Sequence, residues 1–156
     1  MRSRLLIGLG GLSAMCGISA VAAQMLSHRQ LRLTSAEVSK LPAIVPGAGT
    51  SGIGAIHMAV LYGDPSADGP YTIALDVPPN TRIKAHTHKD ERTAIVVRGT
   101  WNFGYGARAN DPASKKLGPG SFYSEPAGDA HFARTGADGA TVYISGWGPT
   151  DTHYVE

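Results

Sequence analysis

From Ala55 onward, short stretches in which apolar and polar residues alternate are separated by turns rich in Gly and Pro. Alternation with a period of two places successive side chains on opposite faces of a β-strand. Stretches that recur about every 8–12 residues, with turn residues between them, are typical of an all-β sandwich or barrel. The pattern predicts a hairpin turn over 136–139 and strands over 55–62, 71–77, 82–88, 93–103, 121–124, 131–135 and 141–147.

The first 23 residues follow a different pattern. Arg2 and Arg4 precede an uncharged, mostly apolar or small stretch that runs from Leu5 to Ala23. A basic start, an apolar run and small residues at its end are typical of a secretory signal peptide. We therefore expect residues 1–23 to be a signal peptide cleaved after Ala23, which predicts a periplasmic or secreted protein without stable membrane insertion. An uncleaved membrane anchor is the alternative, because the stretch is about long enough to span a bilayer.

Between the signal peptide and the strands, residues 24–54 are expected to form an N-terminal arm and loop ahead of a barrel domain over 55–156. The run from Thr34 to Glu37 is typical of the start of a short helix, since Ser or Thr caps the first turn. Residues 42–54 are rich in Gly and Pro and predict a loop.

Charge and cysteine content narrow the classes of function. The whole chain has 14 basic and 12 acidic residues and a net charge of +2. Cleavage would remove Arg2 and Arg4 and so leave equal numbers of basic and acidic residues. No basic patch indicates nucleic-acid binding. Cleavage would also remove Cys16, the only cysteine. A disulfide framework is therefore not expected, and any metal must be held by histidines and carboxylates.

Three histidines occupy two short segments about forty residues apart. His86 and His88 are two residues apart and lie on one face of a predicted strand. His131 follows a turn that contains Pro126 and Gly128, and it can meet the first two histidines if the strands close into a barrel. Three converging imidazoles predict a site for a divalent transition metal, namely Fe, Mn, Ni, Zn or Cu. The alternative is that they are only polar residues at the mouth of a barrel.

The two segments resemble the paired motifs of the cupin superfamily, and the resemblance covers about residues 55–148. The first motif reads Gly, five residues, His-x-His, three or four residues, Glu, six residues, Gly, and the second reads Gly, five residues, Pro-x-Gly, two residues, His, three residues, Asn. The matching residues are His86, His88, Gly99, Gly120, Pro126, Gly128 and His131. Asn80 replaces the first Gly, and Asn also tolerates a positive φ, whereas Thr135 replaces the last Asn. The resemblance implies a double-stranded β-helix, the jelly-roll barrel of cupins, with a site in its mouth.

The fourth metal ligand of the motif is the point where the sequence departs from the family. Counting back from Gly99 places Arg92 at the position of the Glu, whereas Glu91 is one residue too early. Alternation favours Arg92 on the inner face, and Glu91 points inward only if a bulge re-aims it. Glu91 as a ligand gives three histidines plus one carboxylate. Arg92 facing inward disfavours a cation and favours an anionic ligand.

These features predict two functions. The first is an exported metal-dependent cupin in which His86, His88, Glu91 and His131 hold the metal, and which acts on a small oxygen-rich organic substrate. Dioxygenase-like oxidation is the reaction that the resemblance most often implies. The second is a non-catalytic cupin that binds an anionic small molecule through Arg92.

Further candidates surround this site. Tyr105 and Tyr123 are candidates for binding the substrate, and Glu125, beside Pro126, for a hydrogen bond to a metal-ligating histidine. Cupins often dimerise by strand exchange or sheet packing, so the resemblance also implies a homodimer, for which the arm before Ala55 offers a contact.

Overall fold

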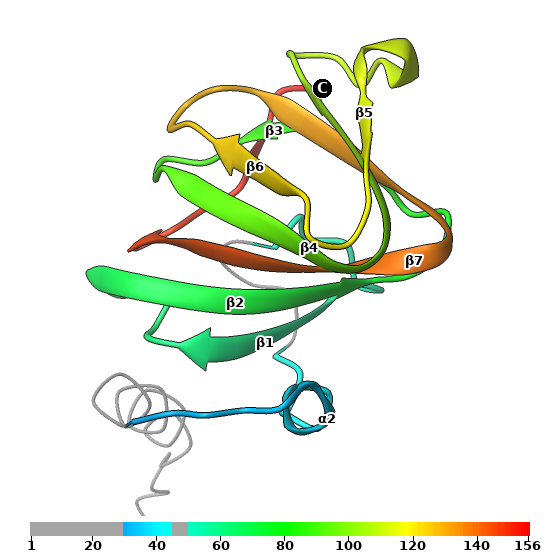
Figure 1. Cartoon of the computed structure of the whole chain (residues 1–156). Coiled ribbons are helices and arrows are strands. Elements are labelled where there is room, and N and C mark those ends of the chain that lie inside the picture. Colours follow the sequence, from blue (N-terminus) through cyan, green and yellow to red (C-terminus); the bar gives the residue numbers. More distant parts are fainter. Residues whose placement is uncertain (1–29, 45–49) are drawn as a thin grey trace, which may run out of the picture.

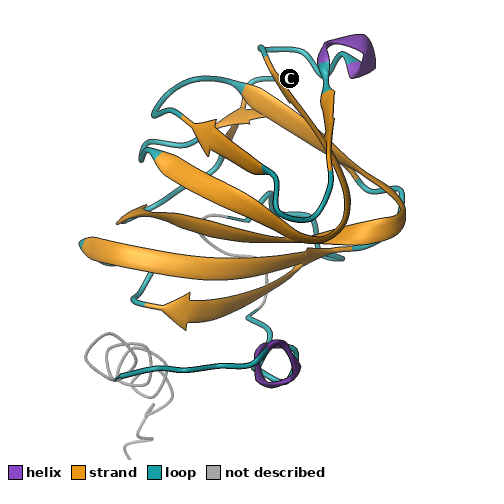
Figure 2. Cartoon of the chain, viewed as in Figure 1, coloured by secondary structure: helices purple, strands orange, loops and turns teal. Residues whose placement is uncertain are grey.

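The computed structural model describes residues 30–44 and 50–156, and the predicted signal peptide lies outside this part of the chain. Within it, antiparallel strands form one eight-stranded sheet that curls into a barrel (Figure 1). The strands are β1 (His57–Tyr62), β2 (Gly69–Val77), β3 (Arg82–Thr87), β4 (Arg92–Tyr105), β5 (Lys115–Leu117), β6 (Phe122–Glu125), β7 (His131–Gly148) and β8 (His153–Tyr154). Figure 2 shows how strongly strands dominate, and this confirms the predicted all-β jelly roll. The described residues contain no helix that is long and apolar enough to cross a membrane.

The arm contains the short helix that the sequence predicts, α2 (Ser35–Val38). Thr34 is its N-cap: the Glu37 amide donates to the Thr34 hydroxyl, and the Glu37 carboxylate accepts from the Thr34 amide at 2.7 Å. This reciprocal arrangement satisfies donors that a helix start leaves open. An isolated bridge, from the Ile44 amide to the Met58 carbonyl, ties the arm to β1. A 3₁₀ turn (Asp111–Ala113) is the other helical element of the described chain.

The predicted hairpin at 136–139 is wrong, because β7 runs through it as one strand of 18 residues. The first part of β7 pairs with β3, the second with β2, and β4 follows both parts. The pairing of β4 with β7 shifts on either side of Gly99, whose φ is +77°, and Gly139 has a φ of +67°. These glycines allow the backbones of β4 and β7 to approach each other closely at a barrel corner. The chain therefore bends at residues 136–139, where the turn residues predicted a reversal.

Two positions at which the sequence departs from the motif have defined roles in the fold. Asn80 has a φ of +54°, so it takes the left-handed conformation expected where the motif has Gly. Thr135 bonds the loop before β3: its hydroxyl donates to the Pro78 carbonyl at 2.7 Å and accepts from the Thr81 amide at 2.8 Å. The turn between β2 and β3, which sets where β3 begins, is thus fixed by contacts with β7.

The core lies between the inward faces of β2, β4 and β7. Ile73, Val96 and Val142 are completely buried, and the alternation along each strand keeps the neighbouring positions outside. Burial of such side chains is worth about 1.5–3 kcal/mol each. The histidine segments lie toward one end of this core, where β3 pairs with both β7 and β8.

Candidate metal centre

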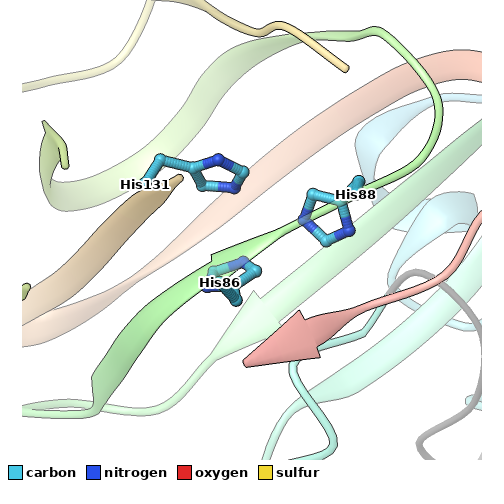
Figure 3. Close-up of side chains that lie close together, drawn as sticks. All are labelled: His86, His88 and His131. Carbon is cyan, nitrogen blue, oxygen red and sulfur yellow. The ribbon is translucent and has the colours of Figure 1, made fainter. Parts of the chain in front are cut away.

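Three histidines meet inside the barrel, as the sequence predicts (Figure 3). His86 is on β3, His88 follows directly after it, and His131 begins β7, where it pairs in register with His86. One nitrogen of each ring lies within 4.8 Å of the others, and all three side chains are buried. The resulting group can hold a metal ion.

Each of the three rings has a fixed orientation and a fixed tautomer. The Nδ1 atom of each ring faces a backbone carbonyl, at 2.7 Å for His86 and 3.1 Å for His131, and His88 makes the same kind of contact. The carbonyls belong to Lys84, Asp129 and Asp151. Because a carbonyl only accepts, Nδ1 carries the proton and Nε2 keeps its lone pair. This arrangement is typical of histidines that bind metals through Nε2.

The electrostatic environment keeps these rings neutral. Burial lowers the pKa of His86 to about 4, with repulsion from His131 adding to the effect. Burial lowers the pKa of His88 to about 3, with the Arg92 charge adding to it. Burial also lowers the pKa of His131. Neutral imidazoles are the form that binds metals, so no proton has to be removed at neutral pH.

Arg92 occupies the inner face of β4, as the alternation predicts, and is 2 % exposed. Its Nε donates to Glu125 Oε2 at 2.6 Å, and its Nη2 contacts both Glu125 Oε2 and His88 Nε2. Arg92 and Glu125 face each other in register across β4 and β6. A cation therefore stands where the motif has a carboxylate, and the carboxylate comes from the neighbouring strand.

The buried Arg92–Glu125 pair is ionised. Desolvation alone would raise the pKa of Glu125, but the Arg92 charge and the nearby histidines outweigh it and hold that pKa below its usual value. Desolvation would lower the pKa of Arg92, but Glu125, together with Tyr71 and Asp90, more than offsets it. Glu125 Oε1 is 3.7 Å from His131 Nε2, and Oε2 is 3.8 Å from His88 Nε2. The carboxylate thus lies beside the histidine group, as the sequence suggests for Glu125.

The structure corrects two of the predicted roles. Glu91 is exposed and stands outside the histidine group, because no bulge re-aims it at the start of β4. Arg92 is already neutralised by Glu125, so it is not available as the anchor for an anionic small molecule. A desolvated ion pair leaves little net charge to attract a second anion.

The two tyrosines predicted to bind substrate have different surroundings. The Tyr105 hydroxyl donates to the Ser124 carbonyl at 2.7 Å, and Tyr105 is 54 % exposed and outside the cavity lining. Tyr123 is buried and lines the histidine cavity, and burial raises the pKa of its hydroxyl well above the usual value. Tyr123 therefore remains near the site as a neutral hydroxyl, and Tyr105 does not reach it.

The histidine cavity has a volume of only about 20 Å³. Two buried polar atoms along its wall, Ser51 Oγ and His131 Nε2, have no hydrogen-bond partner among the described residues, whereas Trp101 Nε1 lies beside the Tyr123 hydroxyl. Such atoms are costly unless something occupies the space they face. An unpartnered Nε2 beside two more neutral imidazoles fits a divalent metal, although Arg92 contacts one of the three nitrogens.

Sequence reasoning missed the C-terminal residues that close the site. Residues 150–156, which we call the C-terminal strap, return across β3 after β7 ends. The strap begins with Thr150, whose hydroxyl donates to Asp90 at 2.6 Å, and Asp90 also accepts from Tyr71 at 2.7 Å. The only signal was a cluster of hydroxyl and carboxyl side chains after Gly148 and Pro149. Such a cluster is, by local sequence alone, typical of an exposed chain end.

Several solved structures are similar to this protein in overall fold. The polyketide cyclase RemF from Streptomyces resistomycificus superposes with a TM-score of 0.62 at 20 % identity, covering 82 % of this chain and 87 % of that one. An RmlC-like cupin from Shewanella frigidimarina superposes with a TM-score of 0.53 at 13 % identity, covering 70 % and 85 %.

This protein has the cupin fold. A sugar phosphate isomerase of the cupin superfamily from Silicibacter pomeroyi is also similar, with a TM-score of 0.56, 15 % identity, and coverage of 75 % of this chain and 78 % of that one. No family model matches the sequence, and no curated protein matches it significantly. At these identities the likeness establishes the cupin fold, and the activity has to be argued from the site.

Proposed function

We propose that this protein is an exported cupin that binds one divalent transition metal ion, Fe, Mn, Ni, Zn or Cu, through His86, His88 and His131. The observation that carries the proposal is the set of three neutral rings whose Nδ1 atoms are all held by backbone carbonyls. Each Nε2 atom therefore keeps a lone pair, and that of His131 is buried without a hydrogen-bond partner among the described residues, whereas that of His88 accepts from Arg92.

Glu125 and Arg92 adjust the charge of this proposed metal site. Glu125 is near enough to the histidines to offset a dication, whereas Arg92 adds a positive charge next to His88. The site is therefore expected to bind metal more weakly than three histidines and a free carboxylate would.

The proposed activity is the conversion of a small oxygen-rich organic substrate, with dioxygenase-like oxidation by dioxygen as the reaction class. The bound metal would supply Lewis-acid or redox chemistry. Around it, Arg92 and Glu125 hold the charge balance, and Tyr123 offers a neutral hydroxyl to a ligand in the cavity. The support for the reaction class is the motif resemblance, and oxygen uptake with candidate substrates tests it.

The metal proposal is tested on full-length protein without a polyhistidine tag. Dialysed protein is titrated with Co²⁺ and Zn²⁺, and bound metal is read from elemental analysis and from the visible absorption of Co²⁺. We expect one ion per chain, and loss of binding in His131→Ala. His153→Ala is the matched control, because His153 is exposed. Binding that survives in His131→Ala, or that is absent from the native protein after reconstitution, contradicts the proposal.

A second pair of variants tests the role of Arg92. Arg92→Gln leaves the Glu125 carboxylate uncompensated beside the histidines and should raise metal affinity at least about tenfold, because a change of one unit charge a few Å away, at an effective dielectric of about 20, alters the binding of a cation by a few kcal/mol. Arg98→Gln removes an exposed charge on the same strand and should leave metal affinity unchanged. Equal affinities in the two variants would show that Arg92 does not compete with the metal.

Sequencing the N-terminus of protein recovered from the producing cells tests export. A mature chain that begins at Gln24 supports the proposed signal peptide. A chain that keeps residues 1–23 supports the membrane anchor instead.

A further inference from the structure

The carboxylate that the first motif lacks at position 92 stands directly opposite that position, on the neighbouring strand. Arg92 and Glu125 are Cα partners in the antiparallel pairing of β4 with β6 (Figure 1). Side chains at directly opposite positions share one face of a sheet, with Cβ atoms about 4.5–5.5 Å apart. Both side chains are buried. The inner face therefore has a cation where the motif has a carboxylate, and a carboxylate about one strand spacing away.

Glu125 faces two of the three histidine nitrogens that can bind a metal. Its Oε1 is 3.7 Å from His131 Nε2, and its Oε2 is 3.8 Å from His88 Nε2. Both separations exceed the about 2.7–3.2 Å of an N–H···O hydrogen bond. The carboxylate is therefore close to the two rings without being hydrogen-bonded to them through these nitrogens.

The facing atoms carry lone pairs and no proton. The proton of each ring is on Nδ1, which donates to a backbone carbonyl, so Nε2 can only accept, as can the ionised Glu125 carboxylate. Acceptors at this range repel each other unless a cation lies between them. Beside His88 this cation is Arg92, whose Nη2 contacts both His88 Nε2 and Glu125 Oε2. His131 Nε2 has no hydrogen-bond partner among the described residues, so its side of the carboxylate suits a second cation.

The distances on the His131 side fit a shared metal ion. Zn²⁺ in tetrahedral sites holds nitrogen and oxygen ligands at about 2.0–2.2 Å, which places two ligands of one ion about 3.3–3.5 Å apart. The separation of 3.7 Å between Glu125 Oε1 and His131 Nε2 is only slightly larger. The histidine cavity, with a volume of about 20 Å³, has room for an ion and not for an organic compound.

The carboxylate has to move a short way to complete such a site. The ligand atoms of the three histidines lie within 4.8 Å of one another, and Glu125 does not meet this spacing to all three at once. Arg92 holds the carboxylate, since its Nε donates to Oε2 at 2.6 Å and its Nη2 contacts the same oxygen. Rotation of the Glu125 side chain brings Oε1 toward the histidines while Oε2 stays near Arg92. His88 Nε2 becomes available only when Arg92 Nη2 leaves it.

We propose that Glu125 is the fourth ligand of the metal site and that Arg92 is its positioning residue. Arg92 keeps the carboxylate beside the histidines, and when an ion enters it releases His88 Nε2 and shares the carboxylate with the ion. The inference rests on the proposed metal site and deepens it, because it names a ligand and the residue that controls access to His88. It also gives a reason why a buried arginine stands at a ligand position of the motif.

The test is Zn²⁺ titration of full-length, untagged protein. Competition with a chelator gives the affinity, and infrared difference spectra show which carboxylate changes when the ion binds. Glu125→Gln keeps the size of the side chain and removes the carboxylate. We expect its affinity for Zn²⁺ to fall more than about 100-fold, beyond the roughly 10–100-fold that changing a group hydrogen-bonded to a ligand costs. We also expect the carboxylate band that shifts in the native protein to be missing.

Asp90→Asn is the matched control. Asp90 is also a buried carboxylate, but it accepts from Tyr71 and Thr150 and is not among the residues that line the histidine cavity. This variant should keep the shifted band and most of the affinity. Equal losses in Asp90→Asn and Glu125→Gln would show that any buried negative charge acts in the same way, and would overturn the assignment of Glu125 as a ligand.

Exchange of the two residues gives a further test. Arg92→Glu combined with Glu125→Arg keeps the buried pair and moves the carboxylate to the position that it has in the motif. The exchanged variant should bind Zn²⁺ more tightly than Glu125→Gln, and urea unfolding checks that it is folded. A folded exchanged variant that binds no better contradicts the proposal. If it does not fold, the affinity and the infrared band of Glu125→Gln decide.

The outcomes separate this inference from the proposed function. Zn²⁺ binding that is lost in His131→Ala but unchanged in Glu125→Gln refutes Glu125 as a ligand and leaves the histidine site supported. Absence of Zn²⁺ binding from the native protein refutes both.

Discussion

The buried Arg92–Glu125 pair offers a sharp test of the interior described here. Glu125→Gln changes the carboxylate to an amide of nearly the same size and leaves the amide oxygen able to accept from Arg92. The substitution therefore removes charge and little else. Arg92 is 2 % exposed, so water cannot solvate its guanidinium once the negative charge of Glu125 is removed.

The expected cost is large compared with total stability. Removing one partner of a buried pair costs about 3–5 kcal/mol, and the remaining hydrogen bond places this variant near the lower figure. A domain of this kind is stable by about 5–15 kcal/mol in total. With a urea slope of about 1–3 kcal/mol/M, the unfolding midpoint should fall by on the order of 1.5 M.

The assay is urea unfolding at pH 7 with chelator present, followed by tryptophan fluorescence. The matched control is Asp76→Asn, which makes the same change in the exposed pair with Arg98, where the oxygen and nitrogen are 2.8 Å apart. An exposed pair is worth less than about 1 kcal/mol, so the control midpoint should hardly move.

A double variant completes the test. Arg92→Met with Glu125→Leu replaces the pair by apolar side chains and should be less destabilised than Glu125→Gln alone, because no buried charge is left. If Glu125→Gln and Asp76→Asn cost the same, the reasoning about the buried pair is wrong. It is also wrong if the double variant is the least stable of all.

Three further outcomes are expected. Metal-free protein should lose stability as the pH falls from 6.5 toward 4, because the unfolded chain takes up protons that the buried histidines do not. His86 alone, with a pKa of about 4, accounts for roughly 3 kcal/mol, and His88, with a pKa of about 3, adds to this loss; pH-dependent urea unfolding measures the change, and a flat profile contradicts it. Gly99→Ala should lower the free energy of unfolding by more than about 2 kcal/mol, because Gly99 has a φ of +77° and the new Cβ would lie 2.1 Å from a backbone oxygen. Gly118→Ala is the control, since the space around Gly118 is open, and similar melting temperatures for the two variants would refute the corner geometry. Asp90→Ala should loosen the strap and speed hydrogen exchange of the Val155 amide, which bonds to β3; unchanged exchange would show that the strap is held elsewhere.

Much of the interior was predictable because its determinants are local. Alternation places Arg92 inside and Glu91 outside, and the spacing of His86 and His88 puts both rings on one face. The positive φ of Asn80 and the capping by Thr34 follow equally from neighbouring residues. Each of these statements concerns a few consecutive positions.

The features that were mispredicted or missed depend on how distant segments meet. Glycines at 136 and 139 suggested a reversal, but pairing with β2, β3 and β4 keeps β7 running through them. The partner of Arg92 is 33 positions away, on a strand whose register no local pattern specifies. The strap reaches His88 from 63 positions away.

By itself, the sequence determined an all-β chain with His86 and His88 on one face of a strand, because strand periodicity and turn chemistry act over a few residues, and the motif resemblance added the cupin barrel in which His131 joins them. Only the tertiary structure decided that Glu125 neutralises Arg92, that the histidine cavity is too small for an organic ligand, and that the C-terminal strap closes the site. Charge pairing and cavity volume are properties of surfaces brought together by folding. They therefore depend on long-range register and packing that no single segment encodes.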